Sequence, residues 1–137
     1  MSKYPYFKLP PLDNPVYKPY VYVRLGCKKT HRVMDKQQII ALIDSGSDVC
    51  LCKKYIGDYL GINFKKAKKG EITAVNRTQM TGFIHPLTLY FQNKSYEVPF
   101  ILSDNIPDET PVILGQRGFF DHFKITFDLS NKEMEII

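Results

Sequence analysis

Tryptophan is absent from this sequence of 137 residues, and cysteine occurs only three times. So few cysteines, without a recognisable secretory leader, indicate a reducing compartment rather than a disulfide-stapled scaffold. No apolar run approaches the ~20 residues that a membrane-spanning helix needs. We therefore expect a cytoplasmic protein that has no membrane partner.

Patterns that bind metals, nucleotides or nucleic acids are also missing. Cys50 and Cys52 fall on one face of an expected strand, but no histidine stands at ligand spacing to them, which favours a structural role for both thiols. Neither a phosphate-binding glycine loop nor a dinucleotide fingerprint occurs, and no distinctive Ser/His/Asp order is present. We expect no metal, no cofactor and no nucleic-acid partner.

The formal net charge is +5, and most basic residues are scattered along the chain. One local cluster, Lys65, Lys66, Lys68 and Lys69, stands out. Such a cluster is typical of a solvated loop, and the alternative is a patch that binds an acidic partner. The sequence leaves both interpretations open.

Short strand-like segments dominate the rest of the chain. Together with two short helices they predict an all-β barrel or sandwich. The expected strands are 20–25, 37–44, the two arms of a hairpin within 70–91, 94–102, 111–115 and a closing hairpin over 124–137, and the expected helices are 53–61 and 116–123.

Five of the nine prolines lie within residues 1–19. Proline fixes φ and lacks a backbone donor, so this segment is expected to be extended and irregular. Its aromatic residues suggest that it lies on a surface. We accordingly divide the chain into a Pro-rich N-terminal arm, residues 1–19, and a folded domain, residues 20–137.

One apolar run, Ile39–Ile43, ends in a lone acid followed by serine and glycine, Asp44-Ser45-Gly46. Burying a single carboxylate is costly unless it gains a partner. Two facing carboxylates can share one proton, so that one acts as a general base towards water and the other as a general acid. The pattern occurs once in this chain, so a second carboxylate must come from a second copy across a two-fold axis.

The order of the motifs resembles the retropepsin-like (retroviral-type) aspartic proteases. The segments that carry the resemblance are "ALIDSGSD" (41–48) and "VILGQRGFFDHF" (112–123), with a hairpin between them. The resemblance implies an all-β, retropepsin-like acid protease barrel with a flap hairpin and one or two short helices. It also implies a two-fold homodimer that cleaves peptide or protein substrates as an aspartic endopeptidase.

The same resemblance implies roles for individual residues. Asp44 would be the catalytic carboxylate, and Ser45, Gly46 and Gly115 would support the active-site loop. Substrate contacts would come from Gly46, Ser47, Asp48, Ala74, Val75, Asn76, Ile113 and Leu114, of which residues 74–76 fall at the expected flap tip.

Two departures keep alternatives open. Many family members have arginine after the second glycine, where this chain has Gln116 followed by Arg117, and the flap tip lacks the glycines of viral enzymes. One alternative is a catalytically weak or inactive module of the same fold that binds peptides or dimerises. The other is a structural domain of a larger assembly.

Overall fold

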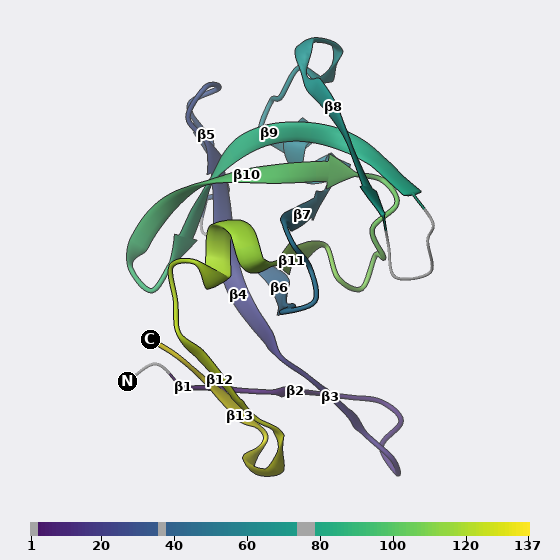
Figure 1. Ribbon diagram of the computed structural model, residues 1–137, viewed down its shortest axis with the longest axis vertical. Helices are drawn as coiled ribbons and strands as arrows, with labels where there is room; N and C mark the ends of the chain where they lie inside the picture. The colour runs from purple at the N-terminus through teal and green to yellow at the C-terminus, as the bar shows by residue number, and fades with distance from the viewer. Residues whose placement is uncertain (1–2, 36–37, 74–78) are drawn as a thin grey trace.

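The computed structural model describes residues 3–35, 38–73 and 79–137. Its strands form a barrel, and a smaller sheet built from both ends of the chain lies at one end of it (Figure 1). The strands are β1 (Lys3–Pro5), β2 (Phe7–Leu9), β3 (Val16–Lys18), β4 (Tyr20–Cys27), β5 (Arg32–Val33), β6 (Ile39–Ile43), β7 (Cys50–Lys53), β8 (Lys68–Thr73), β9 (Gln79–Phe91), β10 (Lys94–Ser103), β11 (Val112–Leu114), β12 (Ile125–Asp128) and β13 (Glu133–Ile136).

Six strands close the barrel. The order is β4–β6–β11–β7–β10–β9, and β4 closes it because it pairs with β6 through its first half and with β9 through its second. Strands β5 and β8 extend the sheet beyond this ring. The expectation of an all-β barrel with few short helices is confirmed.

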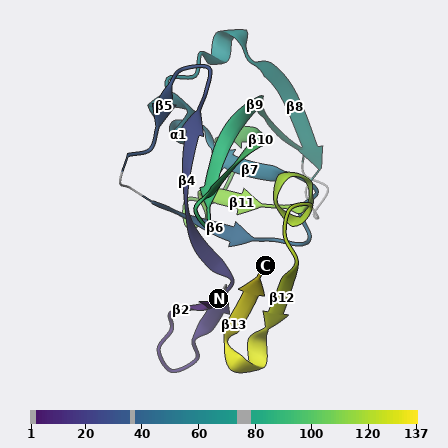
Figure 2. The same ribbon diagram turned by 90° about the vertical axis from the view of Figure 1, so that its left-hand side faces the viewer.

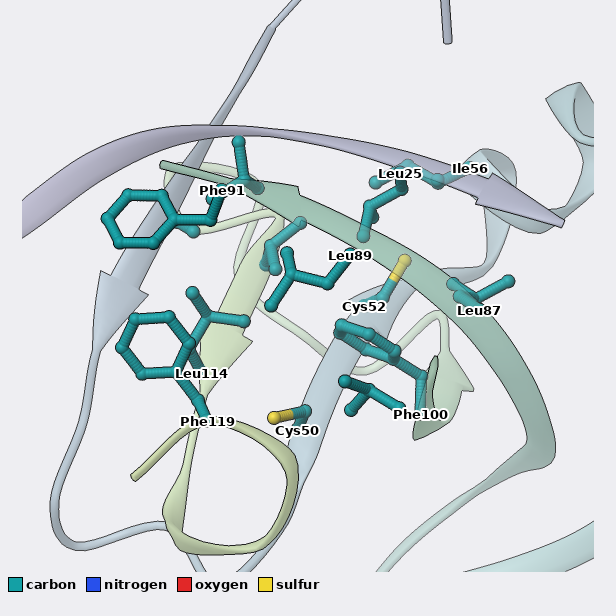
Figure 3. Close-up of a cluster of buried hydrophobic side chains, with 14 of the residues drawn as sticks. Leu25, Cys50, Cys52, Ile56, Leu87, Leu89, Phe91, Phe100, Leu114 and Phe119 are labelled. Atoms are coloured by element: carbon teal, nitrogen blue, oxygen red, sulfur yellow. The ribbon is translucent and has the colours of Figure 1, made fainter. Parts of the chain in front are cut away.

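The barrel interior is filled by side chains that alternate along its strands, as the period of two requires (Figure 3). Leu25, Leu89, Phe100 and Phe119 have no exposed surface. Full burial of one such side chain contributes about 1.5–3 kcal/mol, so this core fixes the short strands β7 and β11 firmly.

Cys50 and Cys52 belong to the core, on one face of β7, as expected. Burial raises the pKa of the Cys50 thiol to about 11, and burial raises the pKa of Cys52 as well. Both thiols are therefore protonated at neutral pH. A protonated thiol is a poor nucleophile and a poor metal ligand. The described residues contain no group of three or more His, Cys, Asp or Glu side chains placed to hold a metal ion.

The N-terminal arm is extended, but it is not irregular. Strand β1 pairs with β13 in a three-stranded sheet with β12, and β2 and β3 form a hairpin, so the two chain ends lie side by side (Figure 2). Pro10, Pro11 and Pro15 fall between β2 and β3, where no ladder hydrogen bond is needed. As expected, the arm's aromatic residues lie on a surface: the Tyr4 ring is 5.5 Å from that of Phe91.

The helix expected at 53–61 is present as α1 (Lys54–Tyr59), whereas the helix expected at 116–123 is reduced to one irregular turn, η2 (Gln116–Phe120). Inside η2, Arg117 is not helical (φ −82°, ψ 119°) and Gly118 has φ +102°. A Cβ at Gly118 would lie 2.4 Å from Cγ1 of Val98, so a side chain does not fit there. Two single 3₁₀ turns, η1 (Phe64–Lys66) and η3 (Leu129–Asn131), complete the helical segments among the residues that the structure describes.

None of the helices in the described parts of the chain is long and apolar enough to cross a membrane.

Candidate active-site loop

The apolar strand β6 leads directly into Asp44. Strand β6 runs parallel to β11, with Ile43 opposite Leu114, and the Asp44 amide donates to the Leu114 carbonyl at 3.0 Å. One residue earlier, the Ile43 amide donates to the Pro19 carbonyl at 3.0 Å. The backbone that presents the carboxylate is therefore fixed on two sides.

Beyond Asp44 the chain turns sharply and is held by its own hydrogen bonds. The Gly46 amide donates to Oδ1 of Asp44 at 2.9 Å, and the Ser47 amide donates to the Asp44 carbonyl at 3.2 Å. The Ser47 hydroxyl donates to the Val49 carbonyl at 2.7 Å. These contacts form an Asx-type turn, which leaves the Asp44 side chain partly exposed at its rim.

Gly115 lies directly beneath this loop, and only glycine fits there. A Cβ at this position would lie 2.3 Å from the carbonyl oxygen of Val49 and 2.5 Å from that of Ser47. The next two amides bond the same loop: Gln116 donates to the Ser47 carbonyl at 2.8 Å, and Arg117 donates to the Asp48 carbonyl at 3.0 Å. These two hydrogen bonds accompany the extended backbone of Arg117 and the positive φ of Gly118, which interrupt the predicted helix at 116–123.

The Gln116 side chain also braces the loop. Its Nε2 donates to the Ser45 carbonyl at 2.7 Å, across 71 positions of sequence. Where an arginine would contribute an ion pair, this glutamine contributes a neutral hydrogen bond to the Asp-Ser-Gly backbone. Although Gln116 stands where many retropepsin-like proteases have arginine, the loop is still connected to the segment that follows β11.

We expect Gln116→Glu to destabilise the protein by about 1 kcal/mol at neutral pH, because an ionised carboxylate has no hydrogen to donate to the Ser45 carbonyl. The loss should shrink as the pH falls through the ordinary glutamate pKa of about 4.3, because the protonated acid can donate again. Urea unfolding at both pH values measures this. Gln38→Glu, at an exposed residue, is the control, and equal losses in the two variants would show that the brace contributes nothing.

The other residues that the sequence analysis expects to contact substrate differ in how exposed they are. Ser47 is partly buried and Asp48 is exposed on the loop, while Ile113 is partly exposed on β11. Leu114 has no exposed surface and lies in the core (Figure 3), which argues against the expected contact with substrate. Ala74, Val75 and Asn76 lie outside the described residues.

Sequence reasoning missed Lys53, which anchors the segment leading into β11. Its Nζ donates to the Ile106 carbonyl at 2.7 Å and lies 2.8 Å from Oδ1 of Asp108. This contact holds the pKa of the Asp108 carboxyl below its usual range. The only sequence signal was a lysine that ends an apolar strand, which by itself is typical of a solvated position.

Solved structures that are similar to this chain over most of its length include two aspartic proteases. One is the EIAV protease complexed with the inhibitor HBY-793, which shares 18% sequence identity, with a TM-score of 0.54, over 79% of this chain and 88% of that one. The other is a retropepsin-like aspartic protease from Rickettsia conorii, which shares 14% identity, with a TM-score of 0.61, over 85% of this chain and 80% of that one.

No model of a known protein family matches the sequence, and no curated protein matches it either. At these identities the structural likeness shows the fold alone. The chain has a retropepsin-like fold, shared with a viral and a bacterial aspartic protease.

Proposed function

We propose that this chain is an aspartic endopeptidase that works as a homodimer, with Asp44 of each copy facing the other. The observation that carries the proposal is the Asp44 loop itself. In a retropepsin-like fold, the one Asp-Ser-Gly loop holds a partly exposed carboxylate on a backbone bonded to β11, and Gly115 packs beneath it.

The chemistry follows from pairing two such carboxylates. Two acids a few ångströms apart share one proton, because both cannot ionise at that distance without strong repulsion. The ionised acid removes a proton from a water molecule, which attacks the peptide carbonyl, while the protonated acid donates to the carbonyl oxygen. One acid must be ionised and the other protonated, so the activity should have an acidic optimum.

Neighbouring residues have complementary roles in this proposal. Gly46 and Asp48 would contact the main chain of the bound peptide, and Ile113 would contact an apolar side chain next to the cleaved bond. Their exposure on one loop and on the adjoining strand supports these roles. The Ser45 carbonyl is occupied by Gln116, while its exposed hydroxyl would bond the loop of the second copy.

We also infer a cytoplasmic location, as the sequence predicts. Supporting it, Cys27, Cys50 and Cys52 are all buried free thiols, as is usual where disulfides do not form.

The concentration dependence of activity tests the dimer. Peptide cleavage per chain should fall on dilution in step with a fall in molar mass by light scattering, because one chain carries one Asp44. Full specific activity from a species with the mass of one chain would contradict the proposal. A dimer that binds peptides without cleaving them at acidic or neutral pH would instead indicate the inactive module of the same fold.

A further inference from the structure

A basic surface at one end of the barrel is not used by the proposed reaction. The turn between β4 and β5 and the segment before β8 lie at the end of the barrel opposite the terminal strands (Figure 1, Figure 2). They meet over a cavity of about 390 Å³. Its lining includes four lysines, which we call the lysine patch: Lys28, Lys29, Lys66 and Lys68.

The lysine patch concentrates the charge of the molecule. Four positive charges less one negative charge, that of Glu97, give this cavity a formal charge of +3, against +5 for the whole chain. Glu97 lies 3.8 Å from Lys28, and it is the only carboxylate of the described residues within ion-pair distance of any of the four. The fold therefore gathers lysines from two distant segments around a single acid.

Both halves of the patch stand on anchored backbone. The Thr30 hydroxyl, next to Lys29, donates to the Leu60 carbonyl at 2.6 Å. On the other side, the Phe64 ring of η1 lies 4.9 Å from the Phe83 ring. A site whose backbone is held in place loses less conformational entropy when it binds.

The cavity also has features that suit an extended peptide. Its lining includes the apolar side chains of Ala67, Ile84 and Pro86 besides the lysines. Strand β8 begins at the cavity with Lys68, and it ends the strand order of the sheet, so in the described part of the chain one edge of β8 has no partner strand. An extended segment can add to such an edge while its side chains contact the adjoining surface.

We propose that the lysine patch docks an extended acidic segment of another protein. Carboxylates on one face of that segment pair with the four lysines, and its backbone runs along β8. Protein is favoured over nucleic acid because the cavity lining contains no arginine, and His85 is its single aromatic side chain on which a base could stack. The proposal does not depend on Asp44 or on catalysis.

Fluorescence anisotropy tests it with a short labelled peptide in which glutamate alternates with valine, which places every carboxylate on one face of a strand. The full chain should bind this peptide at low salt, and added salt should weaken the binding. The peptide with glutamine in place of glutamate should not bind. The double variant Lys66→Glu/Lys68→Glu should bind about tenfold more weakly, since two attractive contacts become repulsive.

The matched control is Lys8→Glu/Lys18→Glu, which makes the same change in net charge at exposed lysines of the β2–β3 hairpin. It should change the affinity less than twofold, well under the tenfold effect of the patch variant. Equal weakening in both variants would overturn the proposal, because net charge alone would then explain the binding. Failure of the wild-type chain to bind would also overturn it, as would tighter binding of single-stranded RNA of the same charge.

Discussion

Asp44→Asn is expected to reduce peptide cleavage by about 10³-fold or more while leaving the fold intact, since general acid–base catalysis by one group contributes about 10²–10⁴-fold. In the proposed dimer the substitution removes both catalytic acids at once. Asparagine keeps the shape of the side chain, and its carbonyl oxygen can still accept the Gly46 amide that bonds Asp44 at 2.9 Å. Product formation from a peptide library, followed by mass spectrometry at acidic pH, measures the effect.

Asp58→Asn is the matched control, because it makes the same chemical change at an exposed position on α1. It should cleave at the wild-type rate. Mixing provides a second measurement: if folded Asp44→Asn chains exchange into wild-type dimers, activity should fall with the square of the wild-type fraction. Wild-type rates from the Asp44→Asn protein would remove Asp44 from the mechanism.

Gly115→Ala is expected to have the largest effect on stability, a loss of about 3 kcal/mol or more. The added methyl group would lie 2.3 Å and 2.5 Å from two carbonyl oxygens of the 47–49 segment. Those atoms are backbone and cannot rotate away, and the Ser47 oxygen already accepts the Gln116 amide. Since small domains are stable by about 5–15 kcal/mol, a loss of about 3 kcal/mol removes about a fifth to more than half of that stability.

Gly46→Ala is the comparison for that measurement. A Cβ at Gly46 would lie 3.2 Å from Oδ1 of Asp44, and no other atom is close enough to clash with it. Chemical unfolding should therefore show a loss of less than about 1 kcal/mol for Gly46→Ala. A Gly115→Ala protein as stable as Gly46→Ala would show that the loop can move away from β11.

Local patterns in the sequence predicted the barrel strands well, but not β1, β2, β3 or β5. Alternation in "YVYVRL" and "KSYEVPFIL" gave β4 and β10, because each strand has one face buried and one face nearer solvent. The pairing of β4 with both β6 and β9 could not be read from the sequence, since no local pattern encodes which distant strands are neighbours.

The candidate site likewise has residues that local motifs predict and a long-range contact that they do not predict. The positions of Asp44, Gly46 and Gly115 followed from their motifs, whereas the Gln116 brace depends on a side chain reaching a loop 71 positions away. The helix expected at 116–123 is interrupted because Arg117 is extended and Gly118 has a positive φ, where the chain packs against the Asp44 loop. The prolines of the N-terminal arm predicted an irregular segment. The pairing of β1 with β13 could not be predicted in this way, because β13 lies at the other end of the chain.

The hydrogen bonds between the Asp44 loop and the segment after β11 also determine when the site can exist during synthesis. Long-range pairings form late, and a chain emerges from its N-terminal end first. Asp44 is made well before Leu114, Gln116 and Arg117, whose backbone groups hold its loop in place. A nascent chain that ends before this segment contains Asp44 but lacks the hydrogen bonds that hold the Asp44 loop in place. The ordered loop therefore forms only after nearly the whole barrel has been made.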